Sequence, residues 1–164
     1  MGMTVIADAG VTLVVSRHLL LFMDDQAGGI PAFEDSQLVG VGSGALSLLC
    51  AASDMGATVI LERHDAAPSV RPGSEWNLAS EGDLELPAGN VLVANLEGDL
   101  ERLPKLGLSS GRWQFRVHVA GRDEAVDLED QLIEEIGATF DSGIGYDDSA
   151  FVTGPEKWLV QLWP

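Results

Sequence analysis

The feature that most constrains the fold is an alternation of polar and apolar residues over the eight residues 112–119, within a strand expected at 112–120. In an extended chain, successive side chains point to opposite sides, so every second residue of this segment would lie on one face. One face would carry Trp113, Phe115, Val117 and Val119, and the other would carry Gln114, Arg116, His118 and Ala120. This period is typical of a half-buried antiparallel strand with one face on a hydrophobic core.

Other short apolar segments, divided by Gly, Pro, Asp and Ser, extend this pattern along the chain. The expected strands cover residues 11–15 with a possible continuation to 23, then 45–51, 58–62, 76–78, 84–86 and 90–96. The final segment, 157–164, is apolar at both odd and even positions, which favours a central strand over an edge strand. The pattern predicts a mainly β protein, an antiparallel β-sandwich, with residues 1–164 forming a single domain.

An acidic insertion separates the two best strands. Residues 123–156 hold eleven Asp and Glu and no Lys or Arg. Within it, Leu128, Leu132, Ile133 and Ile136 recur at helical spacing. We expect one short helix, capped by Asp127 at its start and stopped by Gly137. A structureless acidic loop is the alternative.

The overall charge is strongly negative, with 9 basic against 26 acidic residues and a formal net charge of −17. Such a chain repels nucleic-acid phosphates and anionic membranes, so neither is an expected ligand. It attracts a basic partner, whose association would be fastest at low salt. The competing interpretation is that the acidity only keeps the protein soluble.

Localisation and redox chemistry follow from equally simple features. No apolar run reaches the length of about 18 residues that a membrane-spanning helix needs. The start of the chain lacks a basic region followed by an apolar one, and Cys50 has no second cysteine to pair with. We therefore expect a cytoplasmic protein.

Residues that could carry catalysis or bind a metal are sparse. Ser16 and His18 do not form a plausible nucleophile and base, and Cys50 lies within an apolar segment typical of an inert buried thiol. His18, His64 and His118 lack metal-ligand spacing, so no metal or cofactor is expected. The Asp and Gly residues of 141–148 could bind calcium weakly, although they do not match an EF-hand loop.

The glycine-rich and aromatic residues also have structural interpretations. The glycines of 40–44 lack the dinucleotide-binding spacing and suit a bulge or a strand entry. Trp113, Trp158 and Trp163 fit a sandwich core better than a binding platform.

Several of these segments, in this order, resemble the competence nuclease inhibitor family. They are residues 11–22, 44–46, 57–61 and 111–117, followed by an acidic stretch and a closing strand. Residues 115–123 and 158–164 also resemble the ends of uncharacterised bacterial proteins associated with toxin–immunity loci. The resemblance covers about half of the chain and implies a β-rich inhibitor or immunity protein without catalytic residues.

Together, the resemblance and the charge predict a non-enzymatic protein that neutralises a basic nuclease or toxin through protein–protein interaction. The expected contacts are carboxylates of the insertion: Asp127, Glu129, Asp130, Glu134, Glu135, Asp147 and Asp148. The alternative is a β-sandwich module that binds a small molecule or carbohydrate. Fold alone does not choose between them.

Overall fold

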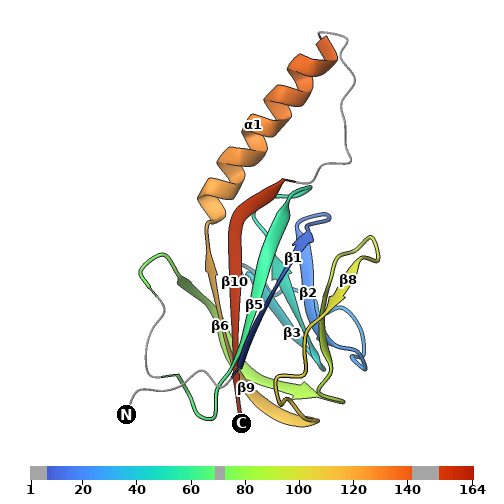
Figure 1. Cartoon of the computed structure of the whole chain (residues 1–164), viewed down its shortest axis with the longest axis vertical. Helices are drawn as coiled ribbons and strands as arrows, with labels where there is room; N and C mark the ends of the chain where they lie inside the picture. Colours follow the sequence, from blue (N-terminus) through green and yellow to red (C-terminus); the bar gives the residue numbers. More distant parts are fainter. Residues whose placement is uncertain (1–6, 69–72, 142–151) are drawn as a thin grey trace.

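The computed structural model describes residues 7–68, 73–141 and 152–164, which form two five-stranded sheets and one helix (Figure 1). Sheet A has the order β1-β5-β10-β9-β6, and sheet B the order β3-β4-β2-β7-β8. The bounds in sheet A are β1 Ala7–Val14, β5 Gly56–Arg63, β10 Thr153–Trp163, β9 Gly111–Ala120 and β6 Asn77–Leu86. Those in sheet B are β3 Val39–Gly42, β4 Ala45–Leu49, β2 Leu19–Asp24, β7 Val91–Ala94 and β8 Leu100–Arg102. The mainly β sandwich is confirmed.

The two strands predicted with the clearest patterns are neighbours in sheet A. β9 and β10 pair antiparallel, with Trp158 opposite Val119 and Leu162 opposite Phe115. β10 is also the central strand, which explains its apolar residues on both faces. Its other neighbour is β5, and this pair is parallel, with Trp158 beside Val59. Sheet A is therefore mixed, whereas the sequence predicted only antiparallel pairs.

The core lies between the sheets and takes side chains from both. The predicted inward face of β9 is buried in it, together with Trp158 of β10 and with Phe22 and Leu46 of sheet B. Burying large apolar side chains of this kind contributes roughly 1.5–3 kcal/mol each. Trp113 and Trp158 are thus core residues as expected, but Trp163 is only partly buried and its ring lies under the Arg116 guanidinium.

The first predicted strand is in fact two strands in different sheets. A tight turn at Arg17 and His18 separates β1 from β2, and both residues have positive φ, 53° and 62°. The amide of Leu19 donates to the carbonyl of Ser16 and closes the turn. This backbone conformation is strained for residues other than glycine, and Arg17 and His18 are not typical turn residues, so no turn was predicted here.

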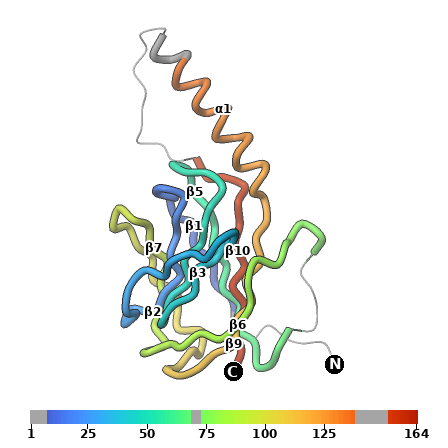
Figure 2. Tube along the Cα trace, turned by 180° about the vertical axis from the view of Figure 1, so that it is seen from behind, coloured from blue at the N-terminus to red at the C-terminus, as the bar shows by residue number. Residues whose placement is uncertain are grey.

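Helix α1, Arg122–Asp141, is longer than predicted at both ends. It begins directly after β9, because Gly121 turns the chain at φ +76°, where a Cβ would lie 2.2 Å from the Pro155 carbonyl oxygen. It continues through Gly137, where glycine costs about 1 kcal/mol but does not end a helix. In two opposite views α1 projects beyond the end of the sandwich (Figures 1 and 2).

Candidate partner-binding site at helix α1

The base of α1 is fastened to the loop of residues 50–55, which connects β4 of sheet B to β5 of sheet A. Ala125 is fully buried and packs with Ala52 and Met55, and Leu128 and Leu132 add to this small apolar cluster. The carboxylate of Glu129 accepts a hydrogen bond from the Ser53 amide at 2.6 Å. One face of the first turns of α1 is therefore docked against the sandwich.

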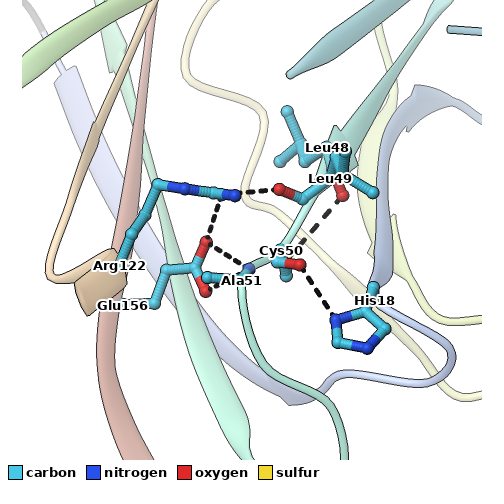
Figure 3. A network of polar contacts seen from close by, with 7 residues as sticks. All are labelled: His18, Leu48, Leu49, Cys50, Ala51, Arg122 and Glu156. Atoms are coloured by element: carbon cyan, nitrogen blue, oxygen red, sulfur yellow. Dashed lines mark hydrogen bonds and ion pairs between the residues drawn. The ribbon is translucent and has the colours of Figure 1, made fainter. Parts of the chain in front are cut away.

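An ion pair between the partly exposed Arg122 and the buried Glu156 joins the start of α1 to β10 (Figure 3). Arg122 Nη1 donates to Glu156 Oε1 at 3.0 Å and to the Leu49 carbonyl at 2.6 Å. The Ala51 amide donates to both oxygens of the same carboxylate, at 3.2 and 2.9 Å. The carboxylate thus connects α1, β10 and the 50–55 loop.

Glu156 is only 2% exposed. Burial raises its pKa, while the Ala51 amide and the Arg122 charge act in the opposite direction. Of the eleven acidic residues in the insertion, this one belongs to the interior rather than to an acidic surface. Removing either partner of such a pair leaves an uncompensated charge or an unpaired amide, so we assign the pair a structural role.

The turn between β1 and β2 reaches the same loop. The His18 amide donates to Ser53 Oγ at 2.8 Å, and the Asp54 amide donates to the Val15 carbonyl at 2.8 Å. Arg17, His18 and Asp54 all have positive φ. Strained backbone therefore gathers where the loop supports α1, and the dense hydrogen bonding holds it in place.

The exposed face of α1 is acidic. At about 100° per residue, Asp123, Asp127, Asp130 and Glu134 fall on one side of the helix, away from Ala125, Leu128 and Leu132. All four are exposed. With a rise of about 1.5 Å per residue, they span roughly 16 Å along the helix. We call these four residues the acidic face.

The predicted contact residues are thus distributed unequally. The structure places Asp127, Asp130 and Glu134 together on the acidic face, and Glu135 is exposed on a different side of the helix. Glu129 is partly buried and bonded to Ser53. Asp147 and Asp148 lie outside the described residues. Asp123 belongs to the predicted acidic insertion but was not among the chief contacts named there.

Almost no positive charge compensates this face. Arg122 is turned inward, and Lys157 lies over the Trp76 ring at 5.5 Å. Arg116 on β9 pairs with Glu81, whereas Arg17 is exposed in the turn between β1 and β2 at this end of the sandwich. The seven Asp and Glu residues between 123 and 135 outnumber these cations, so the field around α1 remains negative.

Two hollows flank the base of α1. One of about 470 Å³ lies between the helix and the start of β10, and Glu124, Asp127, Gln131 and Thr153 are among its lining residues. The other, of about 330 Å³, lies towards β6 and contains Glu75, Asp123 and Glu124. Each hollow has at least two carboxylates in its lining, which suit cationic groups, and the second also contains Arg122.

The described residues contain no group of three or more His, Cys, Asp or Glu arranged to hold a metal ion. His64 bonds to Glu62 at 2.9 Å, and Cys50 is buried. His118 is buried on β9, where burial and the neighbouring Arg116 lower its pKa. Most of the predicted weak calcium segment, 141–148, lies outside the described part of the chain. Within that part, no helix is long and apolar enough to cross a membrane.

Comparison with known proteins supports the fold. No family model matches the chain, and no curated protein matches it in sequence. One similar solved structure is that of ComJ from Bacillus subtilis, an inhibitor of the DNA-degrading activity of NucA. It has a TM-score of 0.54 at 10% identity, covering 94% of this chain and 93% of ComJ.

A second similar structure is described as crocagin biosynthetic gene J. Its TM-score is 0.52 at 16% identity, and the match covers 96% of this chain and 97% of that protein. The resemblance to the competence nuclease inhibitor is thereby confirmed for the fold, over nearly the whole length of both chains.

Proposed function

We propose that this chain is a non-enzymatic inhibitor of the immunity type, which neutralises a basic nuclease or toxin in the bacterial cytoplasm. The observation that carries the proposal is the acidic face of α1, four exposed carboxylates on a helix that projects from the sandwich. The fold shared with ComJ, itself a nuclease inhibitor, supports the same function.

The proposed mechanism is occlusion. A nuclease holds DNA with Lys and Arg that replace the counterions of the phosphates. A line of carboxylates about 16 Å long offers those cations an alternative anionic ligand and covers the cleft where the backbone would lie. The hollows beside α1, with Glu75, Glu124 and Asp127, would receive basic side chains at the edge of this contact.

The geometry of the base suits this task. A projecting helix makes a precise contact only if its direction is fixed. The Arg122–Glu156 pair fixes α1 to β10 of sheet A, the Arg122–Leu49 bond fixes it to β4 of sheet B, and the Ser53–Glu129 bond fixes it to the 50–55 loop. We assign these residues to positioning the acidic face. A direct contact of Glu129, Glu135, Asp147 or Asp148 with the partner remains a prediction.

The test is inhibition of DNA degradation. Two enzymes serve as probes: NucA, and the nuclease or toxin encoded nearest to the gene of this chain. We expect the chain to slow at least one of them stoichiometrically at 50 mM NaCl. The triple variant Asp127→Asn, Asp130→Asn, Glu134→Gln should weaken that inhibition about tenfold, equivalent to ~1.4 kcal/mol of binding free energy.

A matched variant separates local from general charge. Glu34→Gln, Asp35→Asn, Glu101→Gln also removes three exposed carboxylates, from the segment before β3 and from β8. It should inhibit like the wild type. If neither enzyme is slowed, or if both triple variants behave alike, the proposed mechanism is wrong.

A further inference from the structure

Helix α1 carries exposed apolar side chains that the acidic mechanism does not use. Ile133 is 61% exposed, and Val126, seven residues earlier, is 38% exposed. Seven residues are nearly two helical turns, so the two side chains lie on one strip, about 10 Å apart along the axis. We call Val126 and Ile133 the apolar strip.

The apolar strip lies between the docked face and the acidic face. At about 100° per residue around the helix, Val126 and Ile133 come after Ala125, at one edge of the docked face, and before Asp130, at the near edge of the acidic face. Neither strip residue belongs to the buried apolar clusters of the described structure. A partner that touches the acidic face from this side would meet the strip as well.

Isolated exposed apolar residues are common on protein surfaces and need no explanation. Here the position is distinctive, because Ile133 directly follows Leu132, the last α1 residue of the docked cluster, and yet is 61% exposed. Helix α1 as a whole projects beyond the end of the sandwich (Figure 1). A helix that presents apolar side chains at i and i+7 beside charged ones is the form that binds into a groove of another protein.

The neighbouring charge restricts what can cover the strip. A second copy of this chain would bring another acidic face against the first, and like charges would oppose the contact. An anionic membrane is disfavoured for the same reason. Charge complementarity instead selects a protein surface that combines Lys or Arg with apolar side chains.

We propose that α1 binds a partner protein as a helix in an amphipathic basic groove, with Val126 and Ile133 against apolar side chains that lie beside the cations. This inference rests on the proposed function for the basic character of the partner, and it adds an apolar contact. The apolar contact contributes binding free energy that salt does not screen. The carboxylates raise the association rate and make binding depend on salt concentration.

The test uses two labelled peptide probes of equal charge and measures fluorescence anisotropy at 50 and 500 mM NaCl. One is an 18-residue amphipathic helix of Leu and Lys, and in the other every Leu is Gln. We expect the wild type to bind the Leu/Lys peptide about tenfold more tightly. Ile133→Ser, and independently Val126→Ser, should remove most of that preference at both salt concentrations.

The matched control is Leu100→Ser, which removes an apolar side chain of similar exposure, 50%, from β8. It should retain the preference. The inference is overturned if neither peptide binds, if the wild type has no preference, if the strip variants keep it, or if Leu100→Ser also loses it. A large loss of thermal stability in both strip variants would likewise overturn it, by showing that the strip is packed within the chain.

The two proposals fail separately. If the wild type shows no preference for the Leu/Lys peptide but still inhibits a nuclease, the proposed apolar contact is wrong and the proposed inhibitor function stands. If the peptide preference depends on Ile133 but neither nuclease is inhibited, a nuclease is not the partner, and the proposal of a partner with an amphipathic basic surface stands.

Discussion

Arg122 and Glu156, 34 residues apart in sequence, form an ion pair in which the Glu156 carboxylate is buried, with 3.0 Å between Nη1 and Oε1. Arg122 is the first residue of α1, and Glu156 lies on β10, the central strand of sheet A. Through the Ala51 amide the same carboxylate also reaches the loop between the sheets. The direction in which the acidic face points therefore depends on this contact.

Glu156→Ala should lower the free energy of unfolding by about 1–3 kcal/mol, since it leaves the Ala51 amide without its acceptor and the partly exposed Arg122 guanidinium without its charge partner. Urea unfolding followed by tryptophan fluorescence measures this. The exposed Arg112–Asp83 pair is the control, and Asp83→Ala should leave the unfolding midpoint almost unchanged. Equal effects of the two substitutions would contradict the structural role of Glu156.

The stability contributed at Glu156 should also depend on pH. Burial raises the pKa of this carboxyl in the folded state, so the native protein binds its proton more tightly than the unfolded chain. Stability contributed at this position is therefore present at low pH and is lost as the pH rises through the folded-state pKa. Glu156→Gln cannot ionise, so its unfolding free energy relative to wild type should increase as the pH is raised from about 4.5 to 7. A pH-independent difference would contradict this assignment.

The core face of β9 gives a second stability test. Phe115 is 1% exposed, and Trp113 is 5% exposed with its indole N–H donating to the Ser109 carbonyl. Phe115→Ala and Trp113→Ala should each cost about 3–5 kcal/mol. Trp163→Ala is the comparison, and because that ring is only partly buried its effect should be clearly smaller. A thermal melt of Phe115→Ala that coincides with the wild type would contradict the placement of β9.

The sequence predicted β9 and β10 because their signals are local. Alternation identifies a strand with one buried face, and apolar residues on both faces identify a central strand. Short edge strands carry neither signal. All three residues of β8 are exposed. In β3, glycine is needed at position 40 because the backbone of Ala32 packs closely against it, and a Cβ there would lie 2.6 Å from the Ala32 carbonyl oxygen.

The parts of the candidate site likewise differ in whether local sequence could predict them. Three of the predicted contacts are together on one face of α1, although they were predicted from their charge. Helical spacing was used for the apolar residues, and it placed Ile133 with Leu128 and Leu132, whereas the structure leaves Ile133 61% exposed. The earlier start of the helix depends on Ala125 docking against Ala52 and Met55, and the role of Glu156 depends on Arg122. These are long-range contacts, and a single sequence shows no trace of them.

Cys50 should be chemically inert in the folded protein. Its side chain is 2% exposed, and burial, followed by the charge of Glu156, raises the pKa of the thiol. Because the thiolate is the reactive form, a disulfide reagent such as DTNB should react slowly with the native protein and rapidly in 8 M urea. Fast stoichiometric reaction under native conditions would show that the 50–55 loop opens.

The acidic face should lower the stability of α1. Asp123–Asp127 and Asp130–Glu134 are like-charge pairs at i, i+4, and Asp127–Asp130 is one at i, i+3. Such pairs each destabilise a helix by roughly 0.2–0.5 kcal/mol. The triple variant Asp127→Asn, Asp130→Asn, Glu134→Gln should therefore be more stable than the wild type, by about 0.5–1 kcal/mol. Asp123 is retained because a carboxylate in the first turn favours the helix.

Salt provides the independent check, because sodium chloride screens the repulsion that the variant lacks. The melting temperature of the wild type should rise between 20 and 300 mM NaCl, and that of the triple variant should rise less. The matched variant Glu34→Gln, Asp35→Asn, Glu101→Gln should keep the wild-type salt response of α1, followed by helix ellipticity. If the α1 variant melts lower than the wild type, its carboxylates have stabilising partners within the chain. Its loss of nuclease inhibition could then no longer be assigned to the contact surface alone.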